Sequence, residues 1–156
     1  MAMPNLKAVT IFALELDAAR QLQECLQREQ SHLVDADLRA LAVNTEQKNG
    51  LVAHLEMLAG QRMQAIAESG YPETEEGVQA WLKTQNDAVR ADWNQLMALA
   101  ESGKEWNRLN GILINQHMVR VQNALQAVRG GAGQPAVYGP NGQQNTNTPG
   151  RKYTAG

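Results

Sequence analysis

The sequence predicts an all-α protein, an elongated antiparallel helical bundle or coiled coil of three long helices, with a short fourth helix if the third region breaks. Two observations predict this fold. Apolar residues recur at steps of three and four through most of residues 1–129, the period of helices that bury one narrow stripe. Glycine, proline and capping residues separate the periodic stretches, and we find no strands. We therefore expect a helical bundle or coiled-coil domain at 1–129 and a flexible Gly/Pro/Asn-rich tail at 130–156.

The first helix is expected from about Asn5 to Leu33. Its main face keeps heptad spacing through Val9, Phe12, Leu16, Ala19, Gln23, Leu26, Gln30 and Leu33. Two of these positions are glutamines, and polar seam residues weaken a coiled coil while they fix its register. A turn at 31–37 should follow, with Asp35 or Asp37 as the cap of the next helix.

The second helix is expected from about Asp37 to Glu68. Its heptad positions are Leu38, Leu41, Thr45, Lys48, Val52, Leu55, Ala59, Arg62 and Ile66. We expect the alkyl stems of Lys48 and Arg62 to cover apolar neighbours while their charges reach water. The glycine and proline of the stretch 70–72 then end the helix.

A short turn between these two helices predicts an antiparallel hairpin. Its heptad positions predict that Leu16, Leu26, Leu41 and Leu55 are buried against one another or against the later helix.

Thr74 should cap a third helical region that extends to Arg129. This region is either one helix or two, with a restart near Asp87, and Gly103 is its expected weak point because glycine destabilises a helix interior. Trp93 and Trp106 are thirteen residues apart, so they face different directions and only one of them can point into a core.

The end of this region carries a narrow apolar seam at Ile114, Met118, Val121, Leu125 and Val128. These residues are spaced four, three, four and three, and most of the remaining surface is Gln, Asn, Arg and Ala. We expect the seam to bind an amphipathic helix of a partner protein, because an uncovered apolar strip usually marks a binding site. The alternative is that the first two helices cover it as part of the core.

Composition excludes several classes of protein. The formal charge is −2, and 12 basic against 16 acidic residues leave 1–129 at −4, without the basic stripe of a nucleic-acid-binding surface. We find no signal peptide and no apolar run long enough to span a membrane, and the single cysteine, Cys25, fits a reducing compartment. A soluble, cytoplasmic chain without membrane insertion is therefore expected.

We find no candidate for catalysis, for a metal or for a cofactor. His32, His54 and His117 are far apart and lack the spacing of metal ligands. Cys25 has no basic partner nearby in sequence and is expected to be a small core residue. The glycines at 130–133 follow a helix, whereas a phosphate-binding loop precedes one.

Two motifs in the second half of the chain resemble those of flagellar FlgN-type export chaperones. The first is the stretch 107–114, which reads N-x-x-N-G-x-L-I, and the second is the Tyr138-Gly139-Pro140-Asn141-Gly142 turn after a short spacer. The upstream spacing of Lys48, Leu55, Leu58 and Arg62 also fits. Asn141 departs from the family pattern, because it stands where an acidic residue is expected.

The resemblance implies a chaperone that binds the termini of hook-associated junction proteins of the FlgK and FlgL type. It would keep them from associating early and bring them to an export-gate protein of the FlhA type, with Tyr138 docking on the gate. It also implies no enzyme activity and no cofactor. The alternative function is a structural coiled-coil adaptor or a homodimerisation module that uses the same heptads for self-pairing.

Overall fold

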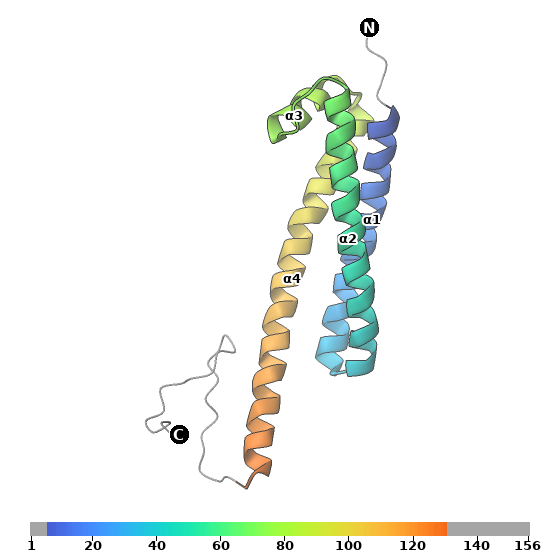
Figure 1. Ribbon diagram of the computed structural model, residues 1–156. Helices are drawn as coiled ribbons and strands as arrows, with labels where there is room; N and C mark the ends of the chain where they lie inside the picture. The colour runs from blue at the N-terminus through green and yellow to red at the C-terminus, as the bar shows by residue number, and fades with distance from the viewer. Residues whose placement is uncertain (1–5, 131–156) are drawn as a thin grey trace, which may run out of the picture. The chain divides into compact units, whose positions relative to one another are not determined.

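The computed structural model describes residues 6–130 and contains four helices there (Figure 1). These are α1 (Leu6–Asp35), α2 (Leu38–Glu68), α3 (Glu75–Lys83) and α4 (Asp87–Val128), with no strand in the described range. The predicted all-α bundle is confirmed. The chain divides into two compact units, Met1–Arg108 and Leu109–Gly156, and the boundary falls within α4, so each unit is described by itself.

Helices α1 and α2 form the predicted antiparallel hairpin, and they pack against each other along their lengths (Figure 1). The turn between them is short because Ala36 adopts a left-handed conformation with φ of 55°. Asp37 caps α2, since its carboxylate accepts a hydrogen bond from the backbone N–H of Ala40 at 3.1 Å. The cap predicted at Asp35 or Asp37 is therefore Asp37.

An aromatic cluster joins α1, α3 and α4 within the first unit. The ring of Phe12 packs edge-on against Trp81 at 5.3 Å and stacks on Trp93 at 5.4 Å between centroids. All three side chains are buried, whereas Trp106 is half-buried. The prediction that only one of Trp93 and Trp106 faces a core is confirmed.

The third helical region consists of two helices, α3 and α4, which is one of the two arrangements expected from the sequence. The break lies at 84–86, where Asn86 caps α4 through a hydrogen bond from the backbone N–H of Val89 to its side-chain oxygen at 3.0 Å. The region does not break at Gly103, its expected weak point, because α4 continues through it. A methyl group at this position would lie 3.9 Å from Leu26, an ordinary van der Waals distance, so the surroundings leave room for a small side chain there.

The predicted face of α2 is partly wrong. Leu16 and Leu26 on α1 are buried as expected, but Leu41 and Leu55 on α2 are only half-buried. The predicted positions Leu38 and Val52 are 76% and 39% exposed. The predicted position Ile66 is buried as expected, and the other buried residues of α2, which lie off the predicted row, are Asn44, Leu58 and Ala65. Helix α2 therefore meets α1 along a neighbouring row, and much of the predicted row faces a groove.

Candidate functional site

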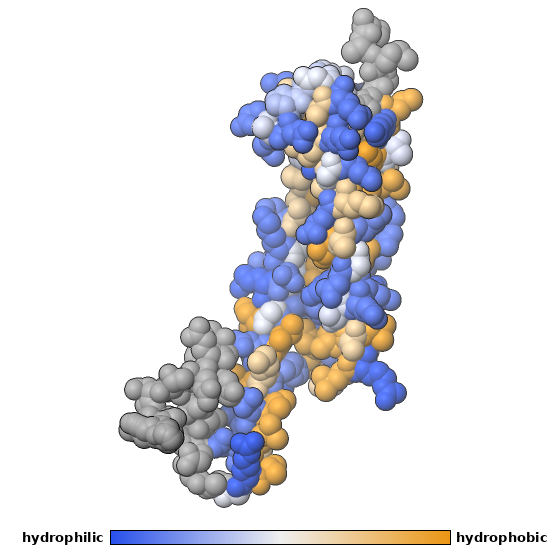
Figure 2. Space-filling model, in the orientation of Figure 1, coloured by the Kyte–Doolittle hydropathy of each residue, from blue (hydrophilic) through white to orange (hydrophobic). Residues whose placement is uncertain are grey.

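The seam at the end of α4 is exposed to solvent. Its five side chains have exposed fractions of 39% (Ile114), 51% (Met118), 57% (Val121), 48% (Leu125) and 82% (Val128). Figure 2 shows apolar side chains gathered along one side of this end of α4. Within the second unit the row is exposed. Whether a partner binds there stays a prediction.

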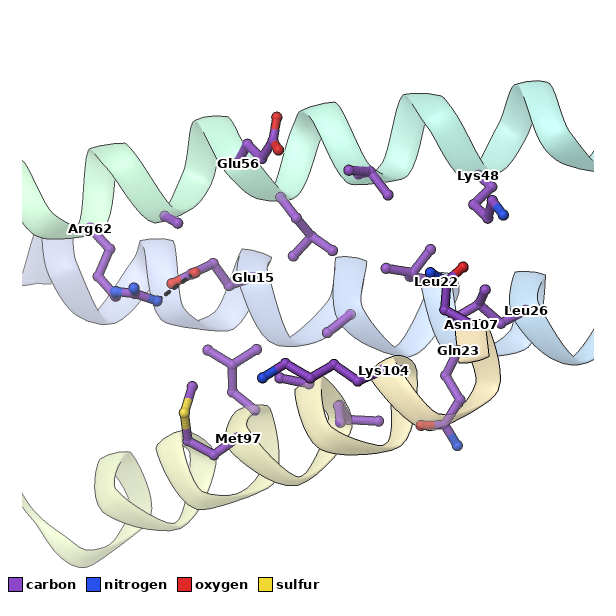
Figure 3. A pocket seen from close by; sticks show the side chains of 18 residues that line it. Glu15, Leu22, Gln23, Leu26, Lys48, Glu56, Arg62, Met97, Lys104 and Asn107 are labelled. Atoms are coloured by element: carbon purple, nitrogen blue, oxygen red, sulfur yellow. Dashed lines mark hydrogen bonds and ion pairs between the residues drawn. The ribbon is translucent and has the colours of Figure 1, made fainter. Parts of the chain in front are cut away.

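A second apolar surface lies entirely within the first unit. It is a groove of about 690 Å³ between α2 and the first part of α4, with α1 along its floor (Figure 3). Its lining is mainly Leu, Val, Met and Ala, with several charged side chains among them. The groove was not predicted from the sequence. The signal for it was present, however, because five heptad positions expected on α2 line it: Lys48, Val52, Leu55, Ala59 and Arg62.

Two buried glutamates of α1 form ion pairs with cations of α2. Arg62 Nη1 lies 2.6 Å from Glu15 Oε2, and Lys48 Nζ lies 2.7 Å from Glu29 Oε2. The side chains of Glu15 and Glu29 are 3% and 2% exposed. The expectation that Lys48 and Arg62 send their charges into water is therefore wrong, because the buried carboxylates draw both cations onto α1.

Burial and the charge of Arg62 act in opposite directions on the pKa of Glu15. Burial raises the pKa of Glu15, while the charge of Arg62 and its hydrogen bond act in the opposite direction without cancelling the rise. The Arg62 guanidinium also lies over the rings of Trp93 and Phe12, at 5.1 and 5.9 Å from their centroids.

Three buried polar atoms of groove-lining side chains have no hydrogen-bond partner among the described residues: Glu15 Oε1, Gln23 Oε1 and Arg62 Nε. Such atoms carry a desolvation cost that a partner molecule can remove. Figure 3 shows Glu15 and Arg62 near one end of the groove and Gln23 toward the other.

Cys25, the one cysteine of the sequence, does not line the groove. Cys25 is fully buried, as predicted, and burial raises the pKa of its thiol, so the reactive thiolate is disfavoured. Within residues 6–130 no three His, Cys, Asp or Glu side chains gather into a group that could hold a metal ion. No described helix is long and apolar enough to cross a membrane. Tyr138 lies outside the described residues.

The described fold is an all-α helical bundle with two apolar surfaces, the seam of α4 and the groove of the first unit. The sequence matches the FlgN protein family over residues 6–146, which is most of the chain, so the chain belongs to that family. FlgN proteins are flagellar export chaperones, and chaperones of this family bind hook-associated proteins of the flagellum. The predicted resemblance is confirmed. Comparisons with curated proteins and with solved structures gave no match.

Proposed function

We propose that this chain is a cytoplasmic export chaperone for hook-associated proteins of the FlgK and FlgL type. It binds a terminus of its client, prevents the client from associating early, and delivers it to an export-gate protein of the FlhA type. The observation that supports this proposal is the exposed apolar seam of α4 in a member of the FlgN family. The chaperone itself carries out no bond chemistry and uses no cofactor.

The seam suits a client segment that folds as it binds. From Ile114 to Val128 it covers roughly 21 Å of helix, which matches about four turns of an amphipathic partner helix. Ordering an unfolded terminus consumes part of the contact free energy, so the affinity should be moderate. A moderate affinity also permits release at the gate.

Charged substitutions in the seam should abolish client binding without unfolding the chaperone. Val121→Asp and Leu125→Asp each place a carboxylate where the client's apolar face must lie, and should weaken binding to its terminal peptide by about 100-fold or more. Both positions are exposed, so the thermal melt followed by circular dichroism should hardly move. Isothermal titration calorimetry with the peptide measures the first effect.

Ala127→Asp is the matched control, because Ala127 is exposed on the opposite side of the same helical turn. This variant should bind the peptide as the unaltered chain does. If the seam variants melt far below the unaltered chain, the row is core. If they bind the peptide normally, the client site lies elsewhere.

The family assignment also supports a separate role for Tyr138. Tyr138→Ala should weaken binding to the cytoplasmic domain of the gate protein and leave client binding unchanged, which two parallel pull-down assays can separate. Loss of both interactions would contradict a gate-specific role and would indicate that the tyrosine supports the fold.

A further inference from the structure

The groove of the first unit lies between two rows of side chains that stay accessible to a partner. Its described lining falls entirely within Met1–Arg108, with α1 as the floor and α2 and α4 as the walls (Figure 3). The α2 wall presents a heptad row in which no member is buried: Lys48, Val52, Leu55, Ala59 and Arg62. The exposed residues of the α4 wall follow steps of three, four and three: Met97, Ala100, Lys104 and Asn107. Two such rows on either side of a third helix leave the place that a fourth helix takes in a bundle.

The length of the groove and its apolar middle suit one face of a helix. The two ends of the α2 row are fourteen residues apart, or roughly 21 Å, which a partner helix of about four turns covers. Between its charged ends the row is apolar, and Val52 remains 39% exposed. Met97, on the α4 wall, is 38% exposed. A partner that covers these side chains removes apolar surface from water, which favours binding.

The cation is the more accessible member of both ion pairs between α1 and α2. Glu15 and Glu29, on α1, are 3% and 2% exposed, whereas their partners Arg62 and Lys48 remain 13% and 20% exposed. Both cations line the groove. An occupant of the groove therefore meets the positive member of each pair, with the carboxylate buried beneath it.

Lys104 adds a third cation, on the α4 wall. Its side chain is 78% exposed, and its ion pair with Glu101 is 3.7 Å long and exposed at both ends, so that pair contributes little. Among the described residues of the lining, the only exposed carboxylate is that of Glu56 on α2. Three accessible cations against one exposed carboxylate favour an occupant with carboxylates on its flanks, because complementary charge selects the partner.

Unpartnered polar atoms at one end of the groove also indicate a ligand. Glu15 Oε1 and Arg62 Nε are buried and have no hydrogen-bond partner among the described residues. They belong to one ion pair, in which the oxygen can accept a further hydrogen bond and the nitrogen can donate one. A side chain that both donates and accepts, such as an amide, satisfies the two and removes their desolvation cost. A purely apolar occupant would leave both atoms unpartnered.

We propose that the groove binds an acidic amphipathic helix of a partner protein, with its apolar face on α1 and carboxylates on the flanks that meet Lys48, Arg62 and Lys104. The partner completes a four-helix arrangement with α1, α2 and the first part of α4. This site is separate from the α4 seam, so the inference does not rest on the proposed function. It adds a second binding surface to the chain.

Fluorescence anisotropy with two designed peptides tests the charge requirement. Both are labelled helices of about 16 residues with leucine at the a and d positions. One carries glutamate on its flanks, and the other carries lysine at the same positions. At about 0.15 M salt, which screens the distant acids of the chain, the glutamate peptide should bind the full chain at least about tenfold more tightly.

Reversing one charge of the groove should weaken this preference. Lys104→Glu should reduce the ratio of the two affinities by at least about threefold, because it replaces an attraction for the glutamate flank by a repulsion. Lys83→Glu is the matched control, since Lys83 is exposed on α3 and does not line the groove. This variant should leave the ratio unchanged.

Two exposed valines of α2 test where the glutamate peptide binds. Val52→Asp places a carboxylate in the lining and should weaken binding by at least about tenfold. The thermal melt should hardly move, because Val52 does not belong to the core. Val43→Asp is the control, since Val43 is 57% exposed and lies outside the lining. Val121→Asp, in the seam, should bind the glutamate peptide as the unaltered chain does.

Several results would overturn the proposal. No binding of the glutamate peptide would do so, and so would equal affinity for the two peptides or a preference that Lys104→Glu leaves unchanged. Because Lys104 is 78% exposed, this variant remains decisive even if Val52→Asp unfolds. Loss of binding in Val121→Asp but not in Val52→Asp would assign the peptide to the seam.

Two further outcomes separate this inference from its alternatives. Dimers of the unaltered chain that the glutamate peptide dissociates in sedimentation velocity would assign the groove to a second copy and overturn the proposal. Normal binding of a client peptide, with no binding of the glutamate peptide, would leave the proposed function standing and remove this inference alone.

Discussion

The side chain of Glu15 is subject to opposing influences. It is 3% exposed and has one oxygen, Oε2, on Arg62, while Oε1 has no partner among the described residues. Burial disfavours its charged form more than the neighbouring guanidinium favours it, so its pKa lies above the ordinary value. A carboxylate held in this way destabilises the fold at neutral pH relative to a protonated carboxyl.

The raised pKa of Glu15 makes a prediction about stability against pH. Because the folded state holds this proton more tightly than the unfolded state, its contribution to stability is full below the unfolded pKa of about 4.3 and is lost as pH rises through the raised folded pKa. Urea unfolding of Glu15→Gln, which removes the titration, should therefore show a smaller loss of stability across that window than the unaltered chain. Equal pH dependence in the two proteins would contradict the prediction, and Glu56→Gln, exposed in the same groove, is the control.

At the scale of the elements, the two buried ion pairs define how α1 and α2 align. Glu15 and Glu29 are fourteen residues apart on α1, and their partners Lys48 and Arg62 are fourteen residues apart on α2. Two heptads therefore separate the pairs on both helices, and a slip of either helix would break both at once. Because removing one partner of a buried pair leaves an uncompensated charge, these contacts favour one register of the hairpin.

Two leucines of α2, Leu55 and Leu58, test which row of side chains on α2 packs against α1. Leu58 is 2% exposed and belongs to the core, whereas Leu55 is half-buried and lines the groove. Leu58→Ala should lower the free energy of unfolding by ~2–5 kcal/mol, and Leu55→Ala by distinctly less. Chemical denaturation of both variants decides the point, and an equal or larger cost for Leu55→Ala would restore the row expected from the sequence.

At the scale of the whole molecule, heptad spacing and capping residues predicted the three helical regions, because both are local properties of the chain, and left open whether the third region is one helix or two. Heptad spacing alone did not reveal which other helix each row of apolar side chains contacts. Leu55 and Leu58 lie on adjacent rows of α2, and only the placement of α1 and α4 decides which one is buried. Helix propensity alone did not locate the break of the third region, because α4 continues through Gly103 and the chain breaks at 84–86 instead.

The seam residues were predicted as a row, but the groove was not, since it requires α2 and α4 to stand apart over α1. Glu15 and Glu29 were missed for another reason: charged side chains are mostly exposed, so a pattern of apolar residues ignores them. Their equal spacing to Lys48 and Arg62 was the available signal.

The α4 seam has one further consequence, which concerns the speed of capture. Apart from Arg120, residues 109–128 contain no formally charged side chain at pH 7 with histidine neutral. Such a surface exerts little long-range attraction, so a partner finds it by diffusion alone, at the roughly 10⁵–10⁶ M⁻¹s⁻¹ of unsteered association. That rate should barely change with ionic strength, because screening acts on charges that this surface lacks. A partner's affinity for the seam is therefore set by how slowly it leaves, and the depth to which its apolar side chains are buried determines that time.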